Sequence, residues 1–477
     1  MRRLHRQTKI TATIGPVTES EETITHLIEK GVDIFRLNMA HADHDWVREI
    51  SSRIRSLGIS LNREPAIMMD VKGPEIRTGY LHEELNLKKD DYLDLIFEAQ
   101  PVPPMSDGIW LIEVNYDKLP EHIKSGDTIL MDNGLIPLSV LESSAQRIRC
   151  RVKQDAILKS RRHVNLPGIE TGLPSLTEKD RKDSLVGIEC EHDYFALSFT
   201  RDADSIDLFR SFLRENGSDA QIIAKIEDHK GVHNLEEIIK ASDAIMVARG
   251  DLGIECALEE LPIIQRKAVG ACLAGGKPVI IATHMLESMI ESPVPTRAEI
   301  SDVANAVNEG ADCIMLSGET TTGKFPIECI DTMNRIASRI EEEITPSLSQ
   351  EVKLFRPKAK MLHSAASLAL SMKNSAVMVF TRSGDLAAKL GALRPNQIPL
   401  FAFTDFPGLH RRLRLIWGIE PFLINFSDDP ETTIQCAIDL LKKKNWVEDG
   451  DKLITVTNIL ADDQVIESIQ IRDVETS

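Results

Sequence analysis

The stretch that decides the fold runs from Gln221 to Asp251 and reads QIIAKIEDHKGVHNLEEIIKASDAIMVARGD. Two short apolar runs, Gln221–Glu227 and Asp243–Ala248, lie on either side of a segment with a helical pattern. Near-continuous apolar runs are typical of parallel strands that are buried on both faces. The stretch therefore predicts a strand–helix–strand unit of an α/β protein.

The same alternation of apolar runs and amphipathic segments extends to both sides of this unit. It predicts strands at Thr8–Gly15, Asp33–Ala40, Pro65–Val71, Tyr194–Phe199, Gln221–Glu227, Asp243–Ala248, Pro278–Thr283 and Cys313–Ser317. Eight such units favour a closed (β/α)8 barrel, the TIM barrel, over an open sheet. In the first connection, Thr18 and Glu21 have the spacing of a capping box and predict a helix that ends at Lys30.

The alternation is interrupted once and is followed by a second α/β pattern. Residues 74–164 contain short alternating segments separated by Gly and Pro, which predicts a small β-domain, a β-barrel, inserted after the third strand. Glu341–Pro357 is charged and predicts a solvated connection. We therefore predict a catalytic barrel at residues 1–73 and 165–345, and a C-terminal α/β domain at residues 346–477. The strands predicted in that last domain are Ser375–Thr381, Pro399–Thr404, Gly418–Ile424 and Lys452–Thr457.

Charge and composition narrow the class of function. The formal net charge is −18, which argues against a nucleic-acid or anionic-membrane partner. The basic segment Met1–Arg6 has no apolar region after it, and no apolar run is long enough to span a bilayer. The seven cysteines are scattered without a C-x-x-C pair, as in a reducing compartment. We expect a cytoplasmic protein.

Polar residues follow the predicted strands at the end where barrel active sites lie. Lys225 and Glu227 are two residues apart, so their side chains would share one face of a strand. Asp251 follows the next strand, and two carboxylates with open positions suit Mg²⁺ or Mn²⁺. Arg36 and Lys225 would neutralise a phosphoryl group, and the turn at Gly250–Leu252 would open a short helix with free N–H groups. Each feature alone fits an ordinary salt bridge or turn, but together they favour phosphoryl transfer.

The motifs around these residues closely resemble pyruvate kinase. They lie at Thr8–Ile10, Thr13–Pro16, Arg36–Asn38, Lys72–Gly79, Val164–Gly168, Lys225–Glu227, Met246–Gly253, Gly276–Ile280, Met285–Met289, Pro295–Val307 and Met315–Thr320. The motifs occur in the family's order and cover the barrel from end to end.

The resemblance implies transfer of a phosphoryl group from phosphoenolpyruvate to ADP, giving pyruvate and ATP, in a homotetramer that uses Mg²⁺ and K⁺. It assigns Lys225 and Thr283 to catalysis; Arg36, Lys225, Gly250, Asp251 and Thr283 to phosphoenolpyruvate; Asn38, His41, Arg77 and Arg162 to the nucleotide; Glu227 and Asp251 to Mg²⁺; and Asn38, Asp70 and Val71 to K⁺.

Departures from the family's pattern cluster near the expected K⁺ site. Ala40 stands where a serine hydroxyl would bind K⁺, while Glu75 is the residue typical of K⁺-dependent members. The K⁺ requirement therefore stays open. The inserted domain resembles the family's mobile lid and is called here the lid domain. His163 replaces a glycine at its base, and His284 replaces a glutamine after Thr283. Ala40, His163 and Ala42, which stands where the family has a glycine, keep a second hypothesis open: a divergent paralogue that binds phosphoenolpyruvate with weak or no catalysis. A third and weaker alternative is another barrel enzyme that acts on enolates of 2-oxo acids.

Two features of the C-terminal region allow more than one interpretation. Thr381, Arg382, Ser383 and Gly384 lie between a predicted strand and helix, where the family binds a phosphorylated effector. The alternative is an ordinary turn with Ser383 as the helix N-cap. Arg411, Arg412 and Arg414 predict a solvated helix face, with an interface or effector role as the alternative.

Overall fold

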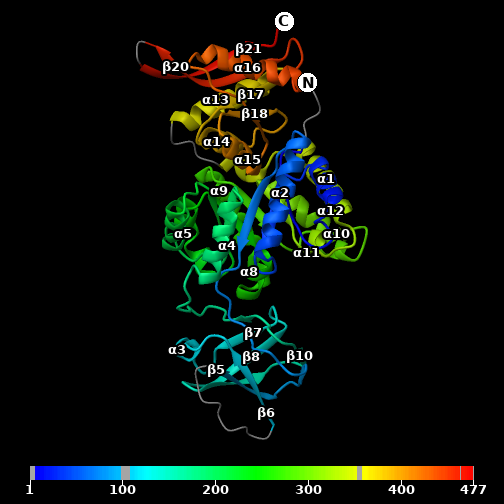
Figure 1. Cartoon of the computed structure of the whole chain (residues 1–477), viewed down its shortest axis with the longest axis vertical. Helices are drawn as coiled ribbons and strands as arrows, with labels where there is room; N and C mark the ends of the chain where they lie inside the picture. Colours follow the sequence, from blue (N-terminus) through cyan, green and yellow to red (C-terminus); the bar gives the residue numbers. More distant parts are fainter. Residues whose placement is uncertain (1–5, 98–107, 352–356, 462–463, 476–477) are drawn as a thin grey trace.

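The computed structural model describes residues 6–97, 108–351, 357–461 and 464–475. Figure 1 shows three parts in a row, with the β-rich lid domain at one end, the barrel in the middle and the C-terminal domain at the other end. None of the helices in these described ranges is both long and apolar enough to cross a membrane.

Eight parallel strands close into a barrel in the order β1-β16-β15-β14-β13-β12-β3-β2. They are β1 (Lys9–Thr13), β2 (Ile34–Asn38), β3 (Ala66–Val71), β12 (Tyr194–Leu197), β13 (Gln221–Ile226), β14 (Ala244–Ala248), β15 (Val279–Ala282) and β16 (Cys313–Leu316). The helices between them include α1 (Glu21–Glu29), α2 (His44–Ser60), α4 (Glu178–Glu189), α5 (Ala203–Glu215), α7 (Leu235–Ala241), α9 (Leu261–Gly275), α10 (Arg297–Glu309) and α12 (Pro326–Glu343). All eight strands that the sequence predicts are confirmed.

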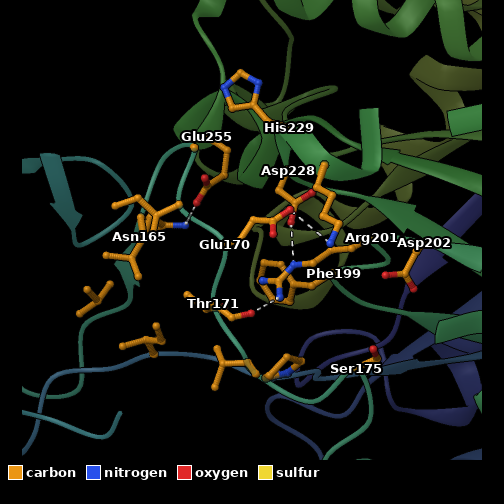
Figure 2. A pocket seen from close by; sticks show the side chains of 18 of the residues that line it. Asn165, Glu170, Thr171, Ser175, Phe199, Arg201, Asp202, Asp228, His229 and Glu255 are labelled. Carbon is orange, nitrogen blue, oxygen red and sulfur yellow. Dashed lines mark hydrogen bonds and ion pairs between the residues drawn. The ribbon is translucent and has the colours of Figure 1, made fainter. Parts of the chain in front are cut away.

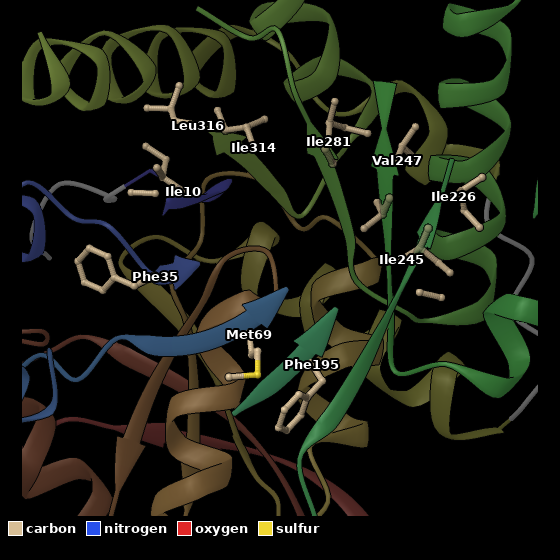
Figure 3. Close-up of a cluster of buried hydrophobic side chains, with 14 of the residues drawn as sticks. Ile10, Phe35, Met69, Phe195, Ile226, Ile245, Val247, Ile281, Ile314 and Leu316 are labelled. Carbon is tan, nitrogen blue, oxygen red and sulfur yellow. The ribbon is translucent and has the colours of Figure 1, made fainter. Parts of the chain in front are cut away.

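The barrel strands are buried on both faces because alternate side chains enter two different apolar clusters. In β16, Ile314 and Leu316 join the outer cluster under the helices, and Cys313 and Met315 join the cluster inside the barrel. Figure 3 shows part of the outer cluster. The inner cluster also includes Leu415, which comes from the C-terminal domain and is fully buried. The barrel interior is thus completed by a residue from another domain.

The lid domain is an all-β insertion between β3 and β12. Its six-stranded sheet has the order β11-β7-β8-β9-β5-β6, and β10 pairs with β4 in a second sheet. The strands are β4 (Leu85–Leu87), β5 (Tyr92–Phe97), β6 (Ile109–Val114), β7 (Thr128–Met131), β8 (Ile136–Ser144), β9 (Arg147–Val152), β10 (Ala156–Leu158) and β11 (Val164–Asn165), with one short helix, α3 (Leu119–His122). A separate apolar cluster fills the domain.

The C-terminal domain has a five-stranded sheet in the order β19-β18-β17-β20-β21. Its strands are β17 (Ser375–Phe380), β18 (Leu400–Thr404), β19 (Ile419–Leu423), β20 (Lys452–Ala461) and β21 (Gln464–Asp473), and its helices are α13 (Pro357–Ser371), α14 (Asp385–Ala392), α15 (Pro407–Arg412) and α16 (Pro430–Lys443). The four predicted strands are confirmed. The fifth strand, β21, was not predicted, and it is antiparallel to β20.

The prediction of a solvated arginine face at Arg411, Arg412 and Arg414, on α15 and the following 3-10 helix η4 (Leu413–Leu415), is wrong. Arg411 and Arg414 are buried, with 9% and 3% of their surface exposed. Arg411 Nε donates to Asp193 Oδ1 at 2.8 Å, just before β12, and Arg412 pairs with Asp219 at 3.0 Å, just before β13. The arginines hold the C-terminal domain against the ends at which the barrel strands begin, which is the interface role.

Two smaller predictions near the barrel are also wrong. Ser20, not Thr18, caps α1, because the Thr18 hydroxyl is buried and donates to the Thr320 carbonyl at 2.8 Å. The connection that begins at Glu341 is not solvated there, because Glu341 is the buried end of α12. Its carboxylate accepts hydrogen bonds from the backbone N–H groups of Gln7 and Thr8, both at 2.7 Å.

Asp33 gives the barrel a pH-dependent stability. This carboxylate, 2% exposed, pairs with Arg6 and with Arg63, both at 2.9 Å. Burial raises its pKa, but Arg6, Lys9 and Arg63 outweigh that effect and lower it to about 2. A depressed folded-state pKa stabilises the fold above the unfolded pKa, and the contribution is lost as pH falls through about 2.

We therefore expect Asp33→Asn to lose about 2 kcal/mol of unfolding free energy at neutral pH. The loss should shrink as the pH falls below about 4, the unfolded-state pKa of an aspartate. Urea unfolding of both proteins at a series of pH values measures the difference. Asp331→Asn, which removes a half-exposed pair with Lys30, is the control and should change little. A pH-independent loss in Asp33→Asn would contradict the assignment.

Candidate active site

Lys225 lies at the end of β13, between two carboxylates. Its ammonium group is 2.9 Å from Glu227 Oε1 and 3.2 Å from Asp70 Oδ1, and it donates to the Ser198 hydroxyl at 2.8 Å. Burial lowers the pKa of Lys225, but attraction by Asp70 and Glu227 outweighs burial and raises it above its usual value. Lys225 is therefore a charged, rigidly held cation, and the predicted sharing of one strand face with Glu227 is confirmed.

Asp70, at the end of β3, joins this cation to a second one. Arg36 reaches Asp70 Oδ2 through two nitrogens, both at 2.7 Å, and also donates to the Thr13 hydroxyl at 3.1 Å. Burial raises the pKa of Asp70, but Lys225 and Arg36 outweigh it and lower the pKa. One buried carboxylate thus positions both cations that the sequence predicts for a phosphoryl group.

Glu227 and Asp251 fit a divalent cation. Glu227 is 1% exposed and its Oε2 accepts the Phe199 backbone N–H at 2.6 Å. Burial raises the pKa of Glu227 above its usual value, Lys225 opposes this shift, and the charge of Asp251 adds to it. The repulsion between the two carboxylates would be relieved by a divalent metal ion. No group of three or more His, Cys, Asp and Glu ligands occurs in the described residues, so two carboxylates would leave positions for water and substrate.

The turn after β14 opens a short helix, α8 (Arg249–Glu255), as the sequence predicts. The Gly250 N–H donates to the Thr283 hydroxyl at 2.6 Å, which brings Thr283 next to the helix start. Thr283 has a φ of 68°, a left-handed conformation that costs energy for a β-branched residue. Arg249 holds it there by donating to its carbonyl at 2.8 Å. Thr283 is thus fixed beside the first turn of α8.

Lys225 and the charged residues near it line a cavity of about 270 Å³. Its lining includes nine of the predicted site residues: Arg36, Asn38, His41, Asp70, Arg77, Arg162, Lys225, Glu227 and Asp251. Gly250, Thr283 and Val71 are not part of the lining. Ser198 and Phe199 also line the cavity and were missed as site residues. Their position at the end of a predicted strand is a signal that would have found them.

The three predicted K⁺ ligands are engaged in other contacts. The Val71 carbonyl accepts from the Ser198 hydroxyl at 2.8 Å, and Asn38 Oδ1 accepts from the Ala40 N–H at 3.1 Å. Asp70 is held by Arg36 and Lys225. A monovalent ion would have to compete with these partners, and Ala40 contributes no side-chain oxygen.

The lid supplies two arginines, Arg77 and Arg162, to the lining of the cavity. Glu75 accepts from Arg77 at 2.7 Å and pairs with Lys72 at 2.9 Å. Burial raises the pKa of Glu75, but its hydrogen bonds to Arg77 and Lys72 outweigh burial and lower it. Arg162 lies 3.3 Å from Asp132. The two predicted nucleotide arginines thus face the cavity with a carboxylate beside each.

A second cavity of about 630 Å³ shares Arg36, Asn38 and His41 with the first. Its other walls include Ile14, Pro16 and Trp46, which gives it an apolar side. Trp46 is fixed by a hydrogen bond from its ring N–H to Glu19 at 2.7 Å. This cavity was not predicted from the sequence.

The predicted effector loop, Thr381–Gly384, lies in the C-terminal domain, between β17 and α14. The Thr381 hydroxyl accepts the Gly384 N–H at 2.8 Å, and Arg382 pairs with Asp405 at 2.8 Å. Gly384, with a φ of 85°, is the N-cap of α14, so the prediction of Ser383 as N-cap is wrong.

Comparisons with known proteins agree with this geometry. A family model described as "Pyruvate kinase, barrel domain" matches residues 5–330, and one described as "Pyruvate kinase, alpha/beta domain" matches residues 359–464. Plastidial pyruvate kinase 2 of Arabidopsis thaliana is 38% identical over 99% of this chain and 82% of its own length. Pyruvate kinase 2 of Synechocystis is 37% identical over 96% of this chain and 77% of its own length.

Similarity extends to the three-dimensional structure. The crystal structure of a pyruvate kinase from Cryptosporidium parvum matches with a TM-score of 0.91 and 33% sequence identity, over 98% of this chain and 96% of that one. With both family models matched along nearly the whole chain, the chain belongs to the pyruvate kinase family.

Proposed function

We propose that the chain catalyses the pyruvate kinase reaction, the transfer of a phosphoryl group from phosphoenolpyruvate to ADP. The observation that carries the proposal is the buried ammonium of Lys225, held 2.9 Å from Glu227 and 3.2 Å from Asp70 at a cavity. A divergent paralogue without catalysis is not favoured, because a chain that had lost the chemistry would have no reason to retain this costly buried charge.

The cations, the metal-binding carboxylates and the backbone N–H groups of the site each have a proposed role. Arg36 and Lys225 neutralise the transferring phosphoryl group, and Lys225 also stabilises the enolate that remains. Glu227 and Asp251 would hold Mg²⁺ or Mn²⁺, which supplies positive charge to the phosphoryl oxygens when bound. The backbone N–H groups of Gly250 and Asp251 bind the substrate carboxylate, which would take over the Gly250 N–H from the Thr283 hydroxyl.

Thr283 has a further proposed role in protonation. Its hydroxyl, released from Gly250 by the substrate carboxylate, would belong to the route that protonates enolpyruvate. The fixed left-handed backbone at Thr283 keeps this hydroxyl beside α8, where the carboxylate is proposed to bind.

The nucleotide is proposed to bind across both cavities. Arg77 and Arg162 would contact its phosphates from the lid, and Asn38 and His41 lie where the two cavities meet. The apolar side of the second cavity, with Trp46, is suited to a base, because aromatic rings stack on nucleobases. Lid closure over the nucleotide would exclude water from the reaction.

Several further properties of the family are proposed on the resemblance alone. They are a K⁺ site at Asn38, Asp70 and Val71, a phosphorylated effector at Thr381–Gly384, a homotetrameric assembly and a cytoplasmic location.

An assay of ADP-dependent pyruvate formation with Mg²⁺ tests the proposed activity. The assay is run in two buffers, one free of alkali metals and one with added K⁺, and we expect turnover in at least one of them. The ratio of the two rates measures the K⁺ requirement. The protein's fold is checked beforehand by circular dichroism. A folded protein that forms no pyruvate in either buffer, yet binds phosphoenolpyruvate, would show that the paralogue hypothesis is correct.

A further inference from the structure

A cavity of about 450 Å³ lies at the base of the lid, separate from the catalytic cavity (Figure 2). Its walls come from both connections to the lid, at Pro74–Ile76 and His163–Ser175, and from barrel loops after β12 and β13. Only His163 and Phe199 line both cavities. No role that we have proposed for catalysis uses this space.

The cavity has an apolar side and an acidic side. Ile169, Leu173 and Phe199 are among its apolar walls. Two of its carboxylates are neutralised within the lining: Asp228 by Arg201 at 3.0 Å, and Glu170 by Lys230 at 3.3 Å. The other two carboxylates of the lining, Asp202 and Glu255, have no ion-pair partner among the described residues. Asp202 caps α5 by accepting from the Ser205 N–H and hydroxyl, whereas Glu255, at the end of α8, accepts only from Asn165.

Glu255 and Asn165 both have unused capacity to accept hydrogen bonds. Glu255 accepts one hydrogen bond, from the Asn165 side-chain N–H at 3.0 Å. Burial raises the pKa of Glu255 and outweighs the hydrogen bond from Asn165, which lowers it, so a cation beside this carboxylate would stabilise its charged form. Asn165 is buried at 4% exposure, and its side-chain oxygen has no hydrogen-bond partner. A buried acceptor without a donor is costly.

We propose that this cavity binds a small amphipathic amine. The ammonium group, with several N–H donors, lies against Glu255 and the Asn165 oxygen, and the apolar body packs on Phe199, Ile169 and Leu173. An anionic ligand would meet the uncompensated carboxylate, and a purely apolar one would leave both acceptors unpaired.

Occupancy of the cavity would affect turnover through the lid. The ligand would contact both lid connections and the barrel at once, and so hold the lid at one distance from the barrel. It would also contact Phe199, whose backbone N–H donates to Glu227 at 2.6 Å. This consequence rests on the proposed function, because it requires that the lid moves during the reaction. We expect kcat to fall while the KM for phosphoenolpyruvate is unchanged.

Calorimetric titration of the native chain with 2-phenylethylamine, 2-phenylethanol and phenylacetate tests the binding site. The amine should bind at least about tenfold more tightly than the alcohol, because a charge-assisted hydrogen bond is replaced by a neutral one. Phenylacetate should not bind. Equal affinity for the amine and the alcohol, or no binding of the amine, would overturn the proposal.

Substitutions in the cavity and on the surface test where in the structure the amine binds. Leu173→Trp fills the cavity and should abolish amine binding, whereas Leu185→Trp, on the exposed surface of α4, should bind as the native chain does. Glu255→Gln should reduce the preference for the amine over the alcohol to less than about threefold. Amine binding that survives Leu173→Trp would locate the ligand elsewhere and refute the assignment.

A catalytically impaired variant separates this proposal from the proposed function. Lys225→Met should bind the amine as tightly as the native chain, because Lys225 does not line this cavity. If the chain forms no pyruvate, calorimetry still tests the amine site. Competition between the amine and phosphoenolpyruvate would instead place the amine in the catalytic cavity and overturn the inference.

Discussion

Replacing Lys225 by methionine should lower the rate of pyruvate formation at least about 100-fold, which corresponds to roughly 3 kcal/mol of transition-state stabilisation. The structure gives two reasons. The ammonium group is the buried cation between Asp70 and Glu227, at 3.2 and 2.9 Å. Its raised pKa also keeps it charged when a negative phosphoryl group arrives. Methionine has a similar length and no charge, so the change removes the electrostatic contribution and little of the packing.

The measurement is kcat and kcat/KM for phosphoenolpyruvate in Lys225→Met, with circular dichroism as a check of the fold. Lys240→Met is the matched control, because Lys240 is exposed on α7 and lines neither the catalytic cavity nor the apolar one beside it. Asp70 keeps its pair with Arg36 in the variant, so we expect the barrel to fold. Turnover of the methionine variant within about tenfold of the native rate would contradict the role given to Lys225.

The barrel could be predicted from the sequence because each of its strands is buried on both faces. A fully buried strand must be apolar along its whole length, and that leaves a signal in every strand that does not depend on knowing its neighbours. β13 and β14 have this pattern, and the segment between them forms two short helices, α6 (His229–His233) and α7, of which α7 buries Leu235, Ile238 and Ile239. The same argument predicts the polar residues at the strand ends, since a charged residue directly after an apolar run is visible in the sequence.

The contact between the barrel and the C-terminal domain could not be predicted in the same way. Arg411 has its partner Asp193 far away in the sequence, and no periodicity connects the two. Clustered arginines on a short helix usually face solvent, so the general expectation was wrong here. Leu415 is similar: one leucine in an apolar segment does not reveal that it completes the interior of another domain.

The site was predicted in part for a related reason. Lys225 and Glu227 are neighbours in sequence and in space, and the structure confirms that they pair. Ser198, which accepts a hydrogen bond from Lys225 at 2.8 Å, comes from another strand, and serine at a strand end is common. The second cavity, beside Trp46, depends on how α2 packs on the barrel, and that packing is tertiary information.

Replacing Asp251 by asparagine should weaken Mn²⁺ binding by roughly 100-fold and lower pyruvate formation by a comparable factor. Losing even an outer-shell partner of a metal ligand typically costs about 10- to 100-fold in affinity. Asp251 is one of only two proposed ligands, and the described residues contain no cluster of three or more His, Cys, Asp and Glu that could replace it. The amide keeps the size of the side chain and removes its charge. Glu227 alone is a poor metal site, because its Oε1 is 2.9 Å from Lys225 and its Oε2 accepts the Phe199 N–H at 2.6 Å.

Mn²⁺ binding measured by electron paramagnetic resonance tests this prediction without relying on activity. The matched control is Asp207→Asn, on the exposed surface of α5, which should bind Mn²⁺ as the native chain does. The activity of Asp251→Asn should recover in part at high metal concentration, because asparagine still offers an oxygen ligand. Native Mn²⁺ affinity in Asp251→Asn would show that the ion lies elsewhere. The charge of Asp251 would then act on the pKa of Glu227 alone, and the two carboxylates would not form a shared metal site.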